Sequence, residues 1–191
     1  MSYKIVKKNM LNPQIFLMEV EAPLIAKKAE PGQFIILRID EYGERVPFTI
    51  ADYDREKGTV TIIVQIVGKT TKDLALLEAG DSLRDFAGPL GMPTPLDGKK
   101  KVAVIGGGLG TAIAYPQAKK LHKLGADVTV ITGFRSKDLI ILEEELKPVA
   151  DKLIIATDDG SNGNQGFVTD MLEKEIQSGE KFDEVIAIGP L

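Results

Sequence analysis

Two short segments of the chain carry residues whose types and spacing suit nucleotide binding. In Val102–Ala112 an apolar run passes into three consecutive glycines and then into a helical pattern. A turn of this kind presents backbone N–H groups and the positive end of a helix to a phosphate. Upstream, Arg45, Pro47, Phe48 and Thr49 place a cation and a hydroxyl on either side of a proline. In this order, the two segments predict a chain that places one nucleotide cofactor against another.

A third segment, between the other two, offers a further place for a phosphate. Gly68, Thr70 and Thr71 stand between an alternating strand pattern and a short helical pattern. Backbone N–H donors, two hydroxyls and a helix N-terminus together suit a pyrophosphate. An ordinary helix N-cap uses the same residue types, so the segment predicts either a pyrophosphate loop or a plain cap.

Polar residues that follow two predicted parallel strands form another candidate group. Arg135 comes after one strand, and Asp159 and Gly160 come after the next. Open parallel sheets bind ligands at the carboxyl ends of their strands, so these residues are candidates for contact with a ribose or a phosphate. A solvated arginine and an ordinary polar turn are the alternatives. Acid–base catalysis by Asp158 and Asp159 is discounted, because neighbouring side chains usually point apart.

The glycine turn departs from the usual dinucleotide-binding fingerprint. Counted from Gly106, the third glycine of a G-x-G-x-x-G pattern is replaced by Thr111, and no acid ends the next strand. A tight strand–helix connection without a ligand is therefore the alternative. Consecutive glycines count against it, because each costs backbone entropy and contributes no side chain to packing.

Composition excludes several classes of chemistry. The 191 residues include 24 basic and 28 acidic side chains, a net charge of −4, and no basic block that would attract nucleic acid. With no cysteine, the chain has no disulfide, thiolate nucleophile or Cys-ligated metal. The single histidine, His122, lies among lysines and is expected on the surface. Apolar runs fall far short of the roughly 20 residues of a membrane span, and no signal peptide is evident, so we expect a cytoplasmic protein without a membrane partner.

The first half of the chain has the pattern of β structure. Six short stretches rich in apolar and β-branched residues are separated by turn signals, which predicts a small antiparallel barrel. One short helical stretch, Thr71–Leu77, interrupts them. The expected strands are Tyr3–Leu11, Gln14–Glu21, Gln33–Ile39, Arg45–Asp52, Thr59–Val67 and Ser82–Phe86.

In the second half, strands alternate with helical periods, which predicts a parallel sheet covered on both faces. A cluster of Pro, Gly and Lys near residues 95–100 marks the boundary between two domains, 1–97 and 98–191. Because the sequence ends directly after an apolar strand, we expect the second domain to continue with a helix in a longer protein. The expected strands are Lys101–Ile105, Asp127–Thr132, Lys152–Ala156 and Glu184–Ile188, and the expected helices are Thr111–Leu124, Leu139–Leu146 and Val168–Gln177.

Taken in order, these segments resemble the ferredoxin–NADP reductase superfamily. The most similar group contains the electron-transfer subunit of dihydroorotate dehydrogenase and the small subunit of NADH-dependent ferredoxin–NADP oxidoreductase, also called sulfide dehydrogenase. The resemblance covers nearly the whole chain, and the order and spacing of its short motifs make it specific. The segments that carry it are Pro31–Phe34, Arg45–Ala51, Gly68–Thr71, Gly80-Asp81, Gly88–Gly91, Gly106–Ala112, Gly133–Arg135, Asp159–Gly163 and Gly189-Pro190.

The resemblance implies an antiparallel Greek-key β-barrel that binds FAD, followed by an α/β domain with a parallel sheet that binds a nicotinamide nucleotide. The implied FAD site consists of Arg45, Pro47, Phe48, Thr49, Gly68, Thr70 and Thr71, with Thr49 a candidate near flavin N5. The implied nicotinamide nucleotide site consists of Gly107, Gly108, Gly110, Thr111, Arg135, Asp159, Gly160, Gly189 and Pro190.

The resemblance also implies cofactors and partners. Members of this group carry a cysteine-ligated [2Fe–2S] centre in a C-terminal segment, and this chain has no cysteine, so the cluster is expected only in a longer, complete chain. The implied partner is a larger flavoprotein or a dihydroorotate dehydrogenase-like subunit, with ferredoxin as a further candidate. Both NAD(H) and NADP(H) serve the superfamily, and similarity to the named subunits favours NAD(H).

The function that follows is that of an FAD-containing NAD(P)H oxidoreductase acting as an electron-transfer subunit. A hydride would pass from the nicotinamide to FAD, and electrons would leave toward an iron–sulfur centre or a partner subunit. The cofactors carry the chemistry, so no catalytic acid or base is required. Two alternatives stay open: a stand-alone flavin reductase that releases its flavin, and a non-catalytic nucleotide-binding regulatory module that binds none.

Overall fold

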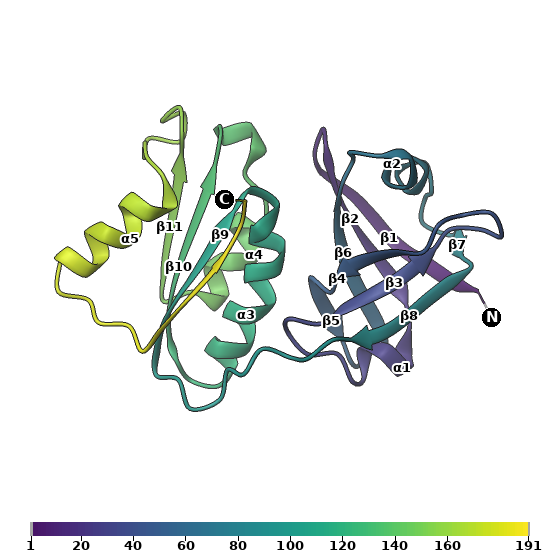
Figure 1. The fold of residues 1–191 in the computed structure, drawn as a ribbon, viewed down its shortest axis with the longest axis horizontal. Helices are drawn as coiled ribbons and strands as arrows, with labels where there is room; N and C mark the ends of the chain where they lie inside the picture. Colours follow the sequence, from purple (N-terminus) through teal and green to yellow (C-terminus); the bar gives the residue numbers. More distant parts are fainter. Residues whose placement is uncertain (1, 191) are drawn as a thin grey trace. The chain divides into compact units, whose positions relative to one another are not determined.

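The structure is a computed structural model that describes residues 2–190 and divides the chain into two compact units, residues 1–94 and 95–191. Each unit has its own sheets (Figure 1). The first unit contains antiparallel strands and the second a parallel sheet, so the predicted fold class is confirmed.

Two antiparallel sheets form the first unit. One sheet has five strands in the order β5-β6-β2-β1-β7, and the other has three in the order β4-β3-β8. Their inner faces enclose a core that includes the fully buried Phe16, Met18, Ile35 and Phe86. The strands are β1 (Tyr3–Asn12), β2 (Ile15–Glu21), β3 (Phe34–Arg38), β4 (Val46–Thr49), β5 (Asp52–Asp54), β6 (Thr59–Gln65), β7 (Ser82–Leu83) and β8 (Asp85–Leu90).

Two stretches that were each predicted as one strand are divided in the structure. In Arg45–Asp52, the N–H of Ile50 donates to the residue before β3, whereas the N–H of Ala51 donates to β6. The chain therefore leaves the small sheet and enters the large one between these two residues, and β4 ends at Thr49. The expected strand Ser82–Phe86 is likewise divided between β7 and β8, which belong to different sheets.

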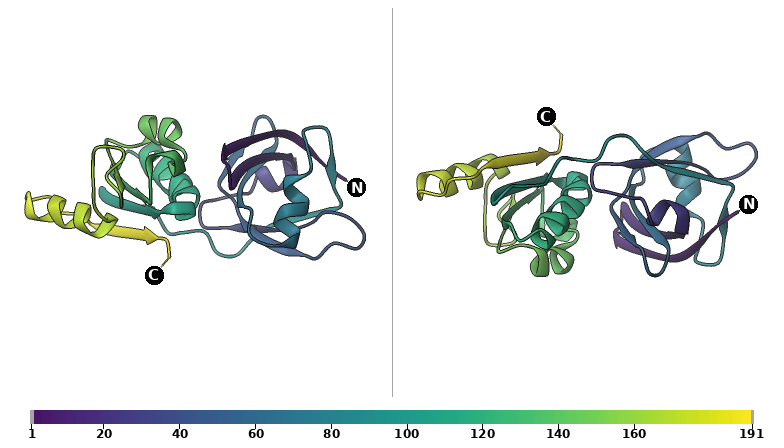
Figure 2. Two further views of the ribbon diagram at one scale, coloured as in Figure 1. Left: turned by 90° about the horizontal axis from the view of Figure 1, so that it is seen from above. Right: turned by 90° about the horizontal axis from the view of Figure 1, so that it is seen from below.

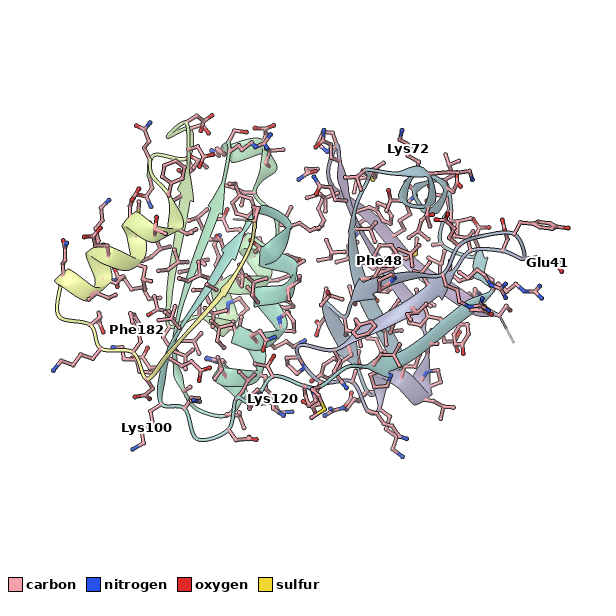
Figure 3. The ribbon with its side chains drawn as sticks, viewed as in Figure 1. Glu41, Phe48, Lys72, Lys100, Lys120 and Phe182 are labelled. Atoms are coloured by element: carbon pink, nitrogen blue, oxygen red, sulfur yellow. The ribbon has the colours of Figure 1, made fainter. Side chains whose placement is uncertain are left out.

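Two short helices lie at opposite ends of the barrel, as the views in Figures 1 and 2 show. Helix α1 (Pro23–Ala26), which sequence analysis missed, follows β2, and α2 (Lys69–Ala75) follows β6. Of the residues of α2, Leu74 alone is fully buried, while Lys72 points away from the barrel (Figure 3). So short a helix with one buried side chain depends on the contacts at its two ends for its position.

A four-stranded parallel sheet in the order β11-β10-β9-β12 forms the centre of the second unit. Helix α3 covers one face and α5 covers the other, over Ile105, Ile131 and Ala156 (Figure 1). Because all four strands are parallel, their carboxyl ends meet at one edge of the sheet. The elements are β9 (Lys101–Gly107), α3 (Thr111–Lys123), β10 (Asp127–Phe134), α4 (Glu143–Leu146), β11 (Lys152–Thr157), α5 (Val168–Gln177) and β12 (Glu184–Ile188).

The predicted helix Leu139–Leu146 is wrong in its first half. Leu142 has a left-handed backbone with φ of 60°, which interrupts the helical path, so α4 begins only at Glu143. Pro148 then ends it, and residues 147–149 form a 3₁₀ turn. The apolar side chains that suggested a longer helix are buried from an irregular segment instead, as Ile141 shows.

Three further observations concern a surface histidine, helix length and metal ligands. His122 is exposed on α3, as predicted. Over residues 2–190, no helix has the length and apolar character needed to cross a membrane, and no group of three or more His, Asp or Glu side chains is placed to hold a metal ion.

Candidate nucleotide-binding sites

The first candidate site begins with β4, an edge strand of the small sheet. Pro47 is exposed on it and removes no hydrogen bond from an inner strand, which is why a proline is tolerated there. Phe48 packs against the barrel core (Figure 3). Thr49 is half-buried at the end of the strand, and its hydroxyl makes no hydrogen bond with residues 2–190. The strand therefore presents an unengaged hydroxyl at the corner where the backbone changes sheets.

Arg45 stands just before β4 with most of its side chain in solvent. Its Nη2 lies 3.3 Å from Asp85 Oδ2, and 64% of the side chain is exposed. The main partner of Asp85 is Arg38, whose Nε lies 2.7 Å from the same oxygen and holds the pKa of Asp85 below its usual range. Of the two arginines near the Asp85 carboxylate, Arg45 is therefore the more weakly held. It can bind a phosphate instead, because Asp85 keeps its ion pair with Arg38.

The Gly68–Thr71 segment forms a closed turn at the start of α2. The Thr71 hydroxyl accepts hydrogen bonds from the N–H groups of Val67 and Gly68, at 2.9 and 3.0 Å, and donates to the Gly68 carbonyl at 3.1 Å. Thr71 therefore closes the turn with its side chain, as a capping residue does. The N–H groups of residues 69–71 head the helix without an intrahelical acceptor.

Charges around this turn are mixed. The Thr70 hydroxyl donates to Glu44 Oε2 at 3.3 Å, so one carboxylate lies beside the turn. The Lys69 ammonium pairs with Asp73 at 2.7 Å, and that pair raises the pKa of Lys69. A Cβ placed on Gly68 would have no atom within 4 Å, so the space in front of this glycine is open. The turn offers backbone donors and open space. Lys69 is already paired with Asp73, and Arg45 is the residue that follows Glu44.

Sequence reasoning missed the residue that holds the far end of α2. Lys8, on β1, has only 6% of its side chain exposed. Its ammonium donates to the Ala75 carbonyl, the last of the helix, at 2.5 Å, pairs with Glu78 at 3.0 Å and lies over the Phe16 ring. A cation at a helix C-terminus is favourable. No sequence pattern signals this contact, because Lys8 and its partners are about seventy residues apart.

In the second unit, most glycines of the turn after β9 have a packing role. A Cβ on Gly106 would lie 2.7 Å from Thr111 Cα, and one on Gly110 would lie 2.8 Å from the carbonyl carbon of Ile188. Gly107 and Gly189 face each other less closely: a Cβ on Gly189 would lie 3.2 Å from Gly107 Cα. The argument that these glycines add nothing to packing is therefore wrong: they let α3 and the end of β12 approach the turn.

Gly108 is the exception in this turn. Its φ is +53°, and a Cβ there would have no atom within 4 Å. Packing therefore does not explain it. A left-handed backbone facing open space, at the carboxyl edge of the sheet and one turn before α3, is the arrangement that admits a phosphate.

The loops after β10 and β11 are hydrogen-bonded to each other. The N–H of Asp159 donates to the Arg135 carbonyl at 3.3 Å, and the N–H of Lys137 donates to the Ser161 hydroxyl at 2.8 Å. Ser161 in turn donates to Asp159 Oδ1 through its hydroxyl, at 2.6 Å, and its N–H. These bonds hold the pKa of Asp159 below its usual range. Arg135 and Asp159 are both exposed, so the structure brings these two predicted residues together at one edge.

The same edge holds an aromatic residue that sequence reasoning missed. Phe167 is 61% exposed and directly precedes α5. The residue before it donates its N–H to the carbonyl of Thr157, the last residue of β11, so the backbone leading into Phe167 lies at the carboxyl end of that strand. An exposed aromatic beside a polar loop can stack on a nucleotide base. A lone phenylalanine among turn residues gave no signal in the sequence.

Comparison with solved structures defines the class of protein. A structure of the NADH-dependent reduced ferredoxin-NADP oxidoreductase matches with a TM-score of 0.91 and 41% identity, over 98% of this chain and 67% of that one. The cytochrome b5 reductase domain of Ulva prolifera nitrate reductase shares the fold, with a TM-score of 0.75 at 19% identity over 99% of this chain and 86% of that one. The chain therefore has the fold of the ferredoxin reductase-like oxidoreductases.

Curated relatives identify the family. The chain is 50% identical over 197 residues to an uncharacterized Clostridium beijerinckii protein from the adh 3′ region, covering 99% of this chain and 67% of the relative. It is 42% identical to a dihydroorotate dehydrogenase B electron transfer subunit homolog of Thermotoga maritima (98% of this chain, 66% of the relative). It is 34% identical to the corresponding electron transfer subunit of Fusobacterium nucleatum (92% and 70%). No family model matches the chain.

The chain belongs to the family of dihydroorotate dehydrogenase B electron transfer subunits and their homologues, within the ferredoxin reductase-like superfamily. The predicted resemblance is confirmed. The chain spans about two thirds of the length of the first relatives it matches.

Proposed function

We propose that this chain is the nucleotide-binding part of an electron-transfer subunit that takes a hydride from a nicotinamide nucleotide onto FAD. FAD would be held by the first unit and the nicotinamide nucleotide by the second. The observation that carries the proposal is the pair of open glycines, Gly68 and Gly108. Gly68 is the N-cap of α2, and Gly108 begins the 3₁₀ turn that leads into α3. An added Cβ on either glycine would have no atom within 4 Å.

The residues of the first unit fit the flavin nucleotide. The exposed Arg45 would neutralise a phosphate of the pyrophosphate, and the free N–H groups at the start of α2 would donate to it. The unengaged Thr49 hydroxyl can hydrogen-bond a flavin ring atom, while Phe48 anchors the strand in the core. When bound, FAD would supply the ability to accept a hydride and pass electrons on one at a time. The carboxylate of Glu44 beside the turn is the group that works against phosphate binding.

The residues of the second unit fit a dinucleotide. Gly108 leaves room for a pyrophosphate next to α3, and Gly107, Gly110 and Gly189 bring the surrounding backbone close together. Thr111 is buried at the start of α3, and its hydroxyl lies 3.5 Å from the Gly106 carbonyl, so it serves the turn. Pro190 follows the glycine that faces Gly107, which keeps the end of β12 beside this turn.

We propose NAD(H) as the nicotinamide nucleotide. The ionised carboxylate of Asp159 can accept a hydrogen bond from a ribose hydroxyl, whereas it would repel a 2′-phosphate. Arg135 in the neighbouring loop is the feature that favours NADP(H). Stopped-flow reduction of the bound flavin by each donor decides between them, and a clear preference for NADPH would overturn this assignment.

The electrons would then leave for a partner. The relatives named as electron transfer subunits support a larger partner subunit of the dihydroorotate dehydrogenase or flavoprotein kind, with ferredoxin as a further candidate acceptor. A [2Fe–2S] centre would belong to a longer, complete chain, because these 191 residues contain no cysteine. An absorbance spectrum of the full-length protein tests both cofactors, since flavin bands and an iron–sulfur shoulder are distinct.

Two variants test the nucleotide sites themselves. Gly108→Val would fill the open space beside α3, so reduction of FAD by NADH should slow sharply while flavin occupancy stays normal. Gly98→Val is the matched control, because Gly98 also has a left-handed φ, +76°, and open space around it. Equal reduction rates for Gly108→Val and Gly98→Val would contradict the proposal.

Loss of flavin during purification of the unaltered protein would favour a stand-alone flavin reductase.

A further inference from the structure

In the loop between β11 and α5, Asn164 Nδ2 donates to the Ile155 carbonyl at 3.0 Å, and the side chain of Asn162 makes three hydrogen bonds. Its Oδ1 accepts hydrogen bonds from the Thr157 hydroxyl at 2.9 Å and from the Asn164 N–H at 3.0 Å. Its Nδ2 donates to the Ile155 carbonyl at 2.8 Å. The side chain therefore joins the irregular loop to the last residues of β11, once as a donor to Ile155 and once as an acceptor from Thr157, and its third hydrogen bond lies within the loop.

This tie determines where Asp159 is held. Ser161 is the residue before Asn162, and it makes both of the short hydrogen bonds to Asp159 Oδ1. Ser161 also accepts the Lys137 N–H, which joins the loop to the segment that follows Arg135. If the side chain of Asn162 loses its hydrogen bonds, we expect the neighbouring Ser161 to shift. The hydrogen bonds of Ser161 to Asp159 and to the segment after Arg135 would then change.

We propose that Asn162 is the positioning residue of the dinucleotide site, and that its donor atom Nδ2 is what the site requires. The inference rests on the proposed function, since it takes this loop to bind the ribose of a nicotinamide nucleotide. Asn162 touches no part of the ligand in this scheme; it acts through Ser161 and Asp159. A carboxylate in its place could still accept from Thr157, but it would face the Ile155 carbonyl with no proton to donate.

Protonation of that carboxyl distinguishes the proposed role from general damage to the fold, because damage to the fold would not be reversed at low pH. In Asn162→Asp, a protonated carboxyl has one O–H donor and one acceptor, which is the pattern of the amide it replaces. The facing Ile155 carbonyl raises its pKa, whereas the Thr157 hydroxyl and the Asn164 N–H, which donate to the other oxygen, lower it. The loop should therefore regain its geometry at pH values below this pKa and lose it at neutral pH.

The experiment measures the dissociation constant for NAD⁺ in full-length, FAD-loaded protein from mildly acidic to mildly basic pH. For Asn162→Asp we expect binding about ten- to a hundredfold weaker than in the unaltered protein at neutral pH, with most of the loss recovered at acidic pH. Flavin occupancy should not change. Asn9→Asp is the control for the same chemical change, since Asn9 is exposed on β1 in the other unit.

A second variant keeps the proposal testable if Asn162→Asp folds poorly. Thr157→Val removes the hydroxyl that donates to Asn162 Oδ1, accepts the Asn162 N–H at 3.4 Å and helps to lower the pKa of Asp159, and it keeps the shape of a buried side chain. It should weaken NAD⁺ binding in the same direction, and the losses of the two variants should not add. Unchanged NAD⁺ binding in both variants, or weaker binding in Asn162→Asp that does not depend on pH, would refute the role of Asn162. Failure of the unaltered protein to bind NAD⁺ would instead refute the proposed function.

Discussion

The close approach of the glycine turn to β12 predicts the effect of Gly110→Ala on stability. Gly110 has an ordinary right-handed backbone, with φ of −55° and ψ of −24°, so strain is not the issue. At such a position alanine normally stabilises a protein by about 0.4–1 kcal/mol. Here the new Cβ would lie 2.8 Å from the carbonyl carbon of Ile188, closer still to its oxygen, and 3.1 Å from Gly189 Cα.

These atoms belong to the backbone and cannot rotate away, so the end of β12 or the start of α3 must shift. Overpacking of this kind costs about 1–3 kcal/mol. After the gain from alanine is subtracted, we expect a net destabilisation of about 1–2 kcal/mol. For a unit of this size that corresponds to a fall in melting temperature of about 5–15 °C.

Calorimetry of the flavin-loaded protein measures the shift, and hydrogen exchange assigns it. The amides of β9 and β12 should exchange faster, whereas those of the barrel strands should be unaffected. The sign of the change in melting temperature tests the reasoning. An unchanged or raised melting temperature would show that Ile188 and Gly189 do not pack tightly against this turn. The packing explanation for Gly107, Gly110 and Gly189 would then be wrong.

Three further predictions concern charged side chains. Arg45→Ala should weaken FAD binding about tenfold to a hundredfold, since a charge-assisted phosphate contact is worth about 1.5–3 kcal/mol; full flavin occupancy after dilution would contradict the role of Arg45. Lys8→Met should loosen the C-terminal end of α2 and lower FAD affinity, measured by flavin release, because the Ala75 carbonyl would lose its buried partner; identical release rates would show that this contact does not position the helix. Ser161→Ala should raise the pKa of Asp159 toward its ordinary value, as NMR titration of the carboxyl would report. Because the folded-state pKa of Asp159 is lowered, its stabilising contribution is present above the ordinary value of 3.8 and is lost as the pH falls through the folded pKa. In Ser161→Ala this acid-dependent loss should be smaller.

Periodicity and turn residues predicted the two kinds of sheet and most of the elements, because those signals are local. The division of Arg45–Asp52 between two sheets could not be predicted, because it depends on which distant strand each N–H meets. The strand patterns on both sides of Ile50 continue without interruption, and only the hydrogen bonds of Ile50 and Ala51 reveal the corner. Leu142 is a similar case, since a leucine carries no sign of a left-handed backbone.

The candidate sites show the same limit. The sequence located the Gly106–Thr111 turn, yet it could not separate Gly108 from its neighbours, because the need for glycine at Gly110 comes from the end of β12 about eighty residues away. Lys8 was missed because it acts through contacts with residues far along the chain, and Phe167 was missed because a single phenylalanine among turn residues gives no signal. Motif order, by contrast, was sufficient to place the chain in its family.

The loop around Asn162 also bears on the chemical ageing of the protein. Asparagine followed by glycine is prone to deamidation, in which the glycine nitrogen attacks Cγ, ammonia leaves, and water opens the resulting imide to a carboxylate. In this fold the Gly163 nitrogen donates to the Gly160 carbonyl at 2.9 Å, and the Asn162 side-chain amide makes three hydrogen bonds, so neither group is free to react.

The hydrogen bonds that shape the loop therefore also protect Asn162 from deamidation. Peptide mapping of stored protein should find Asn162 intact while the loop keeps these bonds. If the proposed dinucleotide site is correct, molecules in which the loop opens for long enough should lose affinity for NAD⁺ with no change in FAD binding.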